Sequence, residues 1–465
     1  MPANQLLRQL GSDVMKGTVA VRRRPGMLDF AVYALPALPL AVVVFPSHAI
    51  LPGFYAQHTR IPIAVIGMIL IVARVFDAVV DPLIGFLSDA TMARRKSRKP
   101  WLAVGAVLLS IAVLPLYAPS PNVGPFYFLG WFLAFYLGYS FIEVPLKAWG
   151  TELARNYVDR SRIATCLAVA FGLGNLAFAL APFLAASDAR SFDATALKAV
   201  GWGVAIAMPL TLIAAAWLVP NGVVPETDKT HIGAVLRALR YNRPLLHFLI
   251  MFVLTGLGQG VFYGMVFLYV TSVLGLQSAF VWVLLADALV TLASVPVWYA
   301  LIRRLQKHRA WALGLAISAL ALALMSWLAH GDRGLLPLLV LVCVRAFGSG
   351  VTQVAPNALL GDVVDYELFK RNVNQAANFH AMVSLATKFT AAMGAGAGLM
   401  IAGLAGFDPR IMNPPDVVAA FKMIALWVPA LILVVGGMAA MGFPLDRRRH
   451  ALVLRRLERQ VRHAA

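Results

Sequence analysis

The sequence predicts an all-α polytopic membrane protein with twelve transmembrane helices in two six-helix bundles. Its composition, the spacing of its apolar runs and the placement of its basic residues all support this fold class. Of the 465 residues, 60% are hydrophobic and only 13% are charged, whereas soluble domains have about 25% charged residues. Such a chain cannot cover several soluble globules with polar surface. Its two cysteines, Cys166 and Cys343, lie in apolar runs, which excludes a disulfide scaffold.

A membrane-spanning helix needs about 20 mostly apolar residues, and the chain contains twelve such runs. The first six are expected at 28–53, 61–87, 101–118, 124–150, 163–186 and 198–218. The last six are expected at 244–274, 279–302, 311–329, 335–360, 377–403 and 419–442. The longer runs predict tilted helices, proline kinks or extensions beyond the bilayer. An Arg cluster followed by a long first run does not fit a cleavable signal peptide, so we expect the first helix to be retained.

Basic residues concentrate in alternate loops of this arrangement. The net charge of +19 would suggest nucleic-acid binding on a soluble protein, but here we expect no such partner. If the N-terminus is inside, thirty of the 40 Lys and Arg residues fall in cytoplasmic segments. The outside segments and their margins hold only Arg60, Arg190, Lys198, Arg333, Arg410 and Lys422. The positive-inside rule therefore predicts that both termini are cytoplasmic.

The spans divide evenly around a polar stretch. We expect an N-terminal bundle at 1–218, a cytoplasmic central loop at 219–243, a C-terminal bundle at 244–442 and a basic cytoplasmic tail at 443–465. Two such halves are typical of a secondary transporter that rocks around a central site. The tail has seven arginines and resembles an amphipathic helix that contacts anionic lipid.

Ionisable residues occur within the predicted spans, where each costs about 2.5–3.5 kcal/mol on insertion scales. They are Arg74, Asp77, Asp81, Glu143, Lys147, Asp287, Arg345 and Lys388. Asp77 and Asp81 are four residues apart, so their carboxylates share one helix face with Arg74. Such a pair can bind Na⁺ or share a proton, which would make it a coupling site. A structural network closed by Arg74 is the alternative.

Glu143 and Lys147 are also four residues apart, with Pro145 kinking the helix between them. Either they neutralise each other, or Glu143 joins the aspartate pair while Lys147 faces the cavity. Lys388 needs a buried carboxylate partner, and the small residues at 391–398 next to it permit close helix packing.

Asp89 and the basic residues after it form a further charged segment. The basic residues are Arg94, Arg95, Lys96, Arg98 and Lys99. This segment is either a latch between helix ends or a topogenic cluster. Asp287 and Arg345 are expected to be structural charges. The sequence has no phosphate-binding loop, metal-ligand spacing or nucleophile elbow, so we expect neither enzyme activity nor a cofactor or metal site.

Several of these segments form recognisable motifs. They are ARVFDAVVDPLIGFLSDAT, RRKSRKPW, YSFIEVPLKAWGTEL, LLGDVVDYELFK and ATKFTAAMGAGAG. Together they resemble the glycoside–pentoside–hexuronide:cation symporters, the melibiose-permease branch of the major facilitator superfamily, over about residues 28–442. The resemblance implies the major facilitator superfamily fold, alternating access through a central cavity, cation-coupled uptake and a bacterial inner membrane.

Site residues follow from the resemblance and from the charge pattern. Cation coupling is implied for Asp77, Asp81, Ser140, Glu143 and Lys388. We expect the substrate cavity to include Tyr33, Lys147, Gln353 and Ser384. We expect gating or structural charges at Arg74, Asp89, Arg94, Asp362 and Asp365.

Departures from the family pattern bear on the ion and the substrate. Val80 stands where melibiose permease has an Asn, which removes an oxygen from any Na⁺ shell. Hard cations need several oxygen ligands, so we expect H⁺ rather than Na⁺ to be the coupling ion. The sugar-binding helix I pair falls on Leu40 and Ala41, and the helix IV tryptophan falls on Lys147. The substrate is therefore not predicted.

Three functions remain in competition. The first is H⁺-coupled symport of a small organic solute such as a sugar or glycoside. The second is transport of a lysolipid or another amphiphile, which the apolar helix I and a Lys147 facing a phosphate would suit. The third is a non-transporting scaffold or sensor, which the retained charges oppose because an inert bundle would gain stability by losing them. Expected partners are the lipid bilayer, a solute and the coupling cation; the oligomeric state is not predicted.

Overall fold

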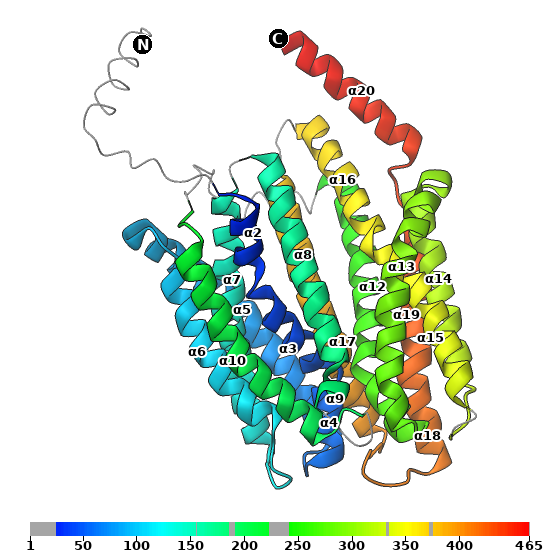
Figure 1. Cartoon of the computed structure of the whole chain (residues 1–465). Helices are drawn as coiled ribbons and strands as arrows, with labels where there is room; N and C mark the ends of the chain where they lie inside the picture. The colour runs from blue at the N-terminus through cyan, green and yellow to red at the C-terminus, as the bar shows by residue number, and fades with distance from the viewer. Residues whose placement is uncertain are drawn as a thin grey trace.

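The computed structural model describes residues 25–154, 156–185, 191–222, 241–331, 334–371 and 375–464, without the side chains of 157, 377 and 458–464. Some features of the sequence analysis lie outside these residues. They are the first 24 residues, positions 223–240 of the predicted central loop, Arg190, Arg333 and the side chains of Arg459 and Arg462. Every regular element in the described part is a helix (Figure 1).

Twelve described helical segments are long and apolar enough to cross a membrane, which confirms the predicted number of spans. The first six spans are α2 (Met27–Ala34) with α3 (Ala37–Ala49), then α5 (Ile63–Arg95), α6 (Lys99–Tyr117), α7 (Pro125–Leu153), α8 (Tyr157–Ala179) and α10 (Ala194–Leu218). Short helices α4 (Leu51–His58) and α9 (Ala181–Leu184) lie between them. Pro36 lies at the break between α2 and α3, because proline cannot donate a backbone hydrogen bond.

The last six spans follow the same plan. They are α12 (Arg243–Leu268), α13 (Phe280–Leu305), α14 (Lys307–Met325), α15 (Leu335–Ser349) with α16 (Ala355–Arg371), α17 (Ala376–Leu404) and α18 (Pro415–Lys422) with α19 (Val428–Met441). Single turns of other helix types complete four of them, at Tyr269–Val273, Gln277–Ala279, Gly350–Gln353 and Met423–Trp427. A tail helix, α20 (Arg447–Ala464), follows the last span.

Helix α5 continues eight residues beyond the end expected at 87. It has 33 residues, about 50 Å at 1.5 Å per residue, against a hydrocarbon core of about 30 Å. It ends at Arg95, and the next residue, Lys96, has a φ of 52° and forms a left-handed C-cap. The hydropathy of the sequence predicts only the apolar part of α5, because the part of a helix that extends into water needs no apolar residues.

The two halves of the bundle meet closely where α5 packs against α17. A Cβ added at Gly67 would lie 2.5 Å from both the Gly396 carbonyl oxygen and the Met400 amide nitrogen. A Cβ at Gly403 would lie 2.5 Å from the Ala64 amide nitrogen. Small residues therefore let the two backbones touch, as in other membrane helix pairs.

Polar links join the halves at the same end of the bundle, which we call the closed end. The Gln57 amide donates to the Thr271 and Ser272 hydroxyls at 2.8 Å each. Arg410 donates to the Thr59 carbonyl oxygen at 3.4 Å. Arg410 also hydrogen-bonds Asp408, which holds the pKa of that carboxyl below its usual range.

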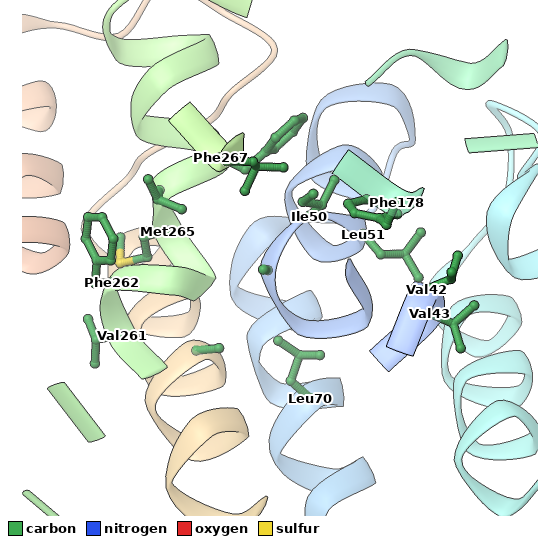
Figure 2. Packing of buried hydrophobic residues seen from close by; sticks show 14 of the residues in the cluster. Val42, Val43, Ile50, Leu51, Leu70, Phe178, Val261, Phe262, Met265 and Phe267 are labelled. Carbon is green, nitrogen blue, oxygen red and sulfur yellow. The ribbon is translucent and has the colours of Figure 1, made fainter. Parts of the chain in front are cut away.

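Apolar packing completes the closed end. Figure 2 shows Phe262, Met265 and Phe267 of α12 on one side and Ile50 and Leu51 of the α3–α4 junction on the other. The side chains of these residues are almost completely buried. At the opposite end, from which α16 and α20 extend in Figure 1, no hydrogen bond or ion pair joins described residues of the two halves.

Candidate functional site

The candidate site lies at the middle of α5, α7 and α17. Asp77 and Asp81 are one turn apart on α5, and Ser140 and Glu143 lie on the facing part of α7. Lys388 lies on α17, about two turns from the Gly396 contact with α5. The structure thus brings together all five residues predicted to couple the cation. Their role in coupling stays a prediction, whereas their proximity is observed.

Asp77 is the most deeply buried acid of the group. Arg74 Nη1 donates to its Oδ2 at 2.5 Å, and Ser140 Oγ donates to its Oδ1 at 2.9 Å. The Arg74 guanidinium also lies over the Tyr136 ring, 5.3 Å from its centroid. Both oxygens of Asp77 are therefore occupied by groups of the same half of the bundle.

Lys388 connects the two halves. Its ammonium donates to Asp81 Oδ2 at 2.7 Å and to Glu143 Oε2 at close range. The same ammonium lies 5.8 Å from the centroid of the Tyr139 ring. A single cation from α17 thus holds acids from two helices of the other half. Tyr139 carries no charge that would mark it in the sequence, although it lies one turn before Glu143 on the same face.

Lys147 is the most accessible charge of the group. Its ammonium donates to Glu143 Oε1 at 2.8 Å, while 59% of its side chain is exposed. The first turn of α7 lies at the closed end, because Phe128 packs on Tyr55 there with ring centroids 4.3 Å apart. Lys147 therefore lies one turn farther from the closed end than Glu143.

The acids at the centre of the site have one unused oxygen. Five of their six carboxylate oxygens accept a hydrogen bond from Arg74, Ser140, Lys147 or Lys388. The sixth, Asp81 Oδ1, is buried and has no hydrogen-bond partner among the described residues. Three acids face three cations, so the site is neutral when every group is charged.

The other predicted cavity residues lie apart from this network. Tyr33 is fully buried; its hydroxyl donates to the Leu146 carbonyl oxygen at 2.7 Å, and its ring packs on Trp149. It therefore holds α2 against α7 and does not face an open cavity. Ser384 is exposed on α17, one turn before Lys388, and Gln353 is exposed in the turn before α16.

The charged turn between α5 and α6 is organised by Arg98, one of the five basic residues in the segment considered as a latch. Arg98 is buried and bonds Asp89 at 2.6 Å, Glu152 at 2.7 Å and Ser88 at 2.8 Å. Arg94, predicted to act with Asp89, is exposed and makes no ion pair with a described residue. Because five basic residues lie close together in the sequence, their pattern does not indicate which one turns inward.

Two further clusters lie in the second half. Lys307 bonds Asp362 at 2.6 Å, and His450 of α20 bonds Asp365 at 3.0 Å. Arg345 pairs closely with Asp287, and both contact the Tyr263 hydroxyl. The second cluster pairs Asp287 with Arg345, the two residues expected to be structural charges.

Comparison with known proteins identifies the family. The sequence profile of the MFS/sugar transport proteins matches residues 32–447. The glucuronide carrier protein homolog of Escherichia coli (strain K12) is 23% identical over 408 residues, which cover 85% of this chain and 88% of the relative. The sodium-dependent lysophosphatidylcholine symporter 1 of Xenopus tropicalis is 21% identical over 452 residues, covering 85% and 84%.

Solved structures show the same fold. The nucleoside transporter NupG superposes with a TM-score of 0.65 at 13% identity. The match covers 90% of this chain and 100% of NupG. A bacterial homolog of the human lysosomal transporter Spinster, inward-facing and occupied, gives 0.64 at 12% identity, covering 92% and 96%. The fold is that of the major facilitator superfamily. Because the profile spans nearly the whole chain, the protein belongs to the MFS/sugar transport protein family and is an integral membrane transporter, not an enzyme.

Proposed function

We propose that the protein is an H⁺-coupled symporter of a small organic solute. The observation that carries this proposal is the single free oxygen, Asp81 Oδ1, in a buried group of three acids. A Na⁺ ion needs several oxygen ligands, and the other five carboxylate oxygens are already held by protein donors. A proton needs only one oxygen. Asp81 is therefore the proposed proton acceptor.

The charge of the site favours a solute with an acidic group. Binding of one proton to the neutral network leaves one excess positive charge in a partly dry region, which is costly. An anionic solute that contacts the exposed Lys147 would compensate that charge. A glycoside with a carboxylate meets this requirement. A glucuronide is such a glycoside, and one relative is named as a glucuronide carrier homolog. Ser384, exposed one turn from Lys388, offers a hydroxyl to such a solute.

Transport of a lysolipid is the second candidate. The lysophosphatidylcholine symporters among the relatives support it, and a phosphate could also contact Lys147. Those relatives are named as sodium-dependent, whereas the shortage of free oxygens in this site does not favour binding of Na⁺. We place the lysolipid second for that reason.

The orientation is also part of the proposal. The positive-inside rule places the end opposite the closed end, where α16 and α20 extend, in the cytoplasm. Under this orientation the closed end faces the outside. We propose the bacterial inner membrane as its location, the two halves as rigid bodies of the transport cycle and the 219–243 segment as their cytoplasmic connection.

Proteoliposomes test the coupling. A panel of glucuronides, neutral glycosides and lysophosphatidylcholine is offered with an inward proton gradient, a Na⁺ gradient or neither. We expect a glucuronide to accumulate with the proton gradient only, and Asp81→Asn to abolish accumulation. Asp416→Asn, an exposed acid at the start of α18, is the matched control and should transport normally. Accumulation driven by Na⁺ alone would refute the proton proposal.

A further inference from the structure

A charged cavity lies away from the central site, where α13 ends and α14 begins, beside the base of α20. Its volume is about 720 Å³. Its charged lining consists of Arg303, Arg304, Lys307, Asp362, Arg447 and His450. The cavity thus joins the turn between two spans to the first residues of the tail helix. The proposed transport cycle assigns no role to it.

The acids at this cavity are already paired. Lys307 Nζ lies 2.6 Å from Asp362 Oδ1. His450 Nε2 lies 3.4 Å from Asp362 Oδ1 and 3.0 Å from Asp365 Oδ2. Asp446 precedes α20 and accepts the Arg449 backbone amide at 2.7 Å.

Three guanidinium groups at the cavity have no such compensation. Arg303, Arg304 and Arg447 are exposed and make no ion pair with a described residue. Four fixed cations, these three and Lys307, therefore face one acid among the lining residues. Arginine presents a fork of donors that matches the oxygens of a phosphate. The cavity has the chemistry of a phosphate site.

Its position indicates where that phosphate comes from. Leu289, Leu292 and Tyr299 are exposed on α13, and helical spacing places them on the same face as Arg303. The opposite face is packed, because Trp298 is buried and donates to the Phe347 carbonyl oxygen. An exposed apolar stripe that ends in an interfacial tyrosine and an arginine is typical of a helix surface facing lipid.

We propose that this cavity binds the headgroup of an anionic phospholipid. Arg303, Arg304 and Arg447 donate to the phosphate, while an acyl chain lies along the apolar stripe of α13. Basic pockets at the cytoplasmic side of membrane proteins bind such headgroups. Because Arg447 begins α20, the bound lipid fastens the tail helix to the second half of the bundle.

Native mass spectrometry of the purified full chain tests the proposal. The protein is released from detergent containing phosphatidylglycerol, phosphatidylcholine, or glycerol 3-phosphate with inorganic phosphate. We expect one tightly retained phosphatidylglycerol per chain and no retained phosphatidylcholine. Arg303→Gln with Arg447→Gln should weaken that retention at least about ten-fold, because each lost guanidinium removes a charge-assisted hydrogen bond.

Matched variants distinguish binding in the cavity from a general effect of positive charge on the protein surface. Arg448→Gln with Arg455→Gln removes the same charge from exposed tail positions outside the cavity and should retain the lipid. Arg303→Lys with Arg447→Lys keeps the charge and should recover part of the affinity. Equal loss in both glutamine variants, or equal retention of phosphatidylcholine, would overturn the proposal. So would binding of the free phosphates without the lipid. The thermal unfolding temperature of each variant without lipid shows whether it folds.

Discussion

Removal of Lys388 should unbalance the buried network in a way that identifies which acid depends on it. In Lys388→Ala, Glu143 keeps the Lys147 ammonium at 2.8 Å. Asp81 loses its only hydrogen-bond donor, since its other oxygen has no partner among the described residues. The cost of the mutation should therefore fall on Asp81, not on Glu143.

The magnitude follows from the burial of the pair. Breaking a fully buried ion pair by removing one partner costs about 3–5 kcal/mol. The Lys388 and Asp81 side chains are each 21% exposed, so some water reaches them and we expect the lower limit, about 3 kcal/mol. Asp81→Asn in the same chain removes the uncompensated charge and should recover about 2 kcal/mol of that loss. Glu143→Gln should recover less than about 0.5 kcal/mol, which is no more than the deviation from additivity seen between independent sites.

Thermal unfolding in detergent and expression level are the two measurements. Wild type, the three single variants and the two double variants form two mutant cycles that share Lys388→Ala. The expected order of stability places Lys388→Ala with Asp81→Asn clearly above Lys388→Ala with Glu143→Gln. Equal rescue by both acids, or rescue by Glu143→Gln alone, would refute the assignment of Lys388 to Asp81. Strict additivity in both cycles would show that the ion pairs have no energetic role.

Three further substitutions test the closed end and the α5–α6 turn. Gly67→Val places new atoms against the Gly396 carbonyl and should destabilise the closed end by about 1–3 kcal/mol, seen as longer distances between spin labels on the two halves at that end. Gln57→Ala removes two hydrogen bonds, about 2 kcal/mol in total, and should shift the same distance distribution, whereas unchanged distances would show that the links are not required. Arg98→Gln leaves the buried Glu152 without its cation and should cost about 3–5 kcal/mol in thermal unfolding; Arg94→Gln is the exposed control and should change it little.

The spans could be predicted because hydrocarbon demands long apolar runs, and the bilayer acts on each helix independently. The extension of α5 to Arg95 could not, since hydropathy ends where the membrane ends. The close contact of α5 with α17 was foreseen only in part. Small residues at 391–398 predicted tight packing, but Gly67 as the contact on the other helix depends on how the halves meet, which one sequence does not encode locally.

The site shows the same limit. Helical spacing predicted that Asp77 and Asp81 share a face, and charge balance required a cation partner for them. The choice among partners was set by tertiary packing: Arg74 bonds Asp77 while Lys388 bonds Asp81. Tyr33 was expected in the cavity, yet its hydroxyl reaches the Leu146 carbonyl in the packed interior. A tyrosine in an apolar run has no local signal that distinguishes these two positions.

The neutral network offers a physical account of coupling under the proposed function. A transporter that reorients only when its buried site carries no excess charge would move when empty, or when loaded with both a proton and an anion. Loaded with a proton alone, it would carry one uncompensated positive charge through a low-dielectric region, which is costly. The permanent charge of Lys147, which is the most exposed of the six, decides which loaded forms are neutral.

Lys147→Gln should therefore abolish uptake of an anionic solute. Its empty site, and its site loaded with a proton and an anion, would each carry one excess negative charge and would not reorient. We expect proteoliposomes of this variant to lose the proton-driven accumulation of a glucuronide that the wild type shows. Lys147→Arg preserves the charge and should retain accumulation. A Lys147→Gln variant that accumulates the glucuronide at the wild-type level would show that the charge of Lys147 has no part in coupling.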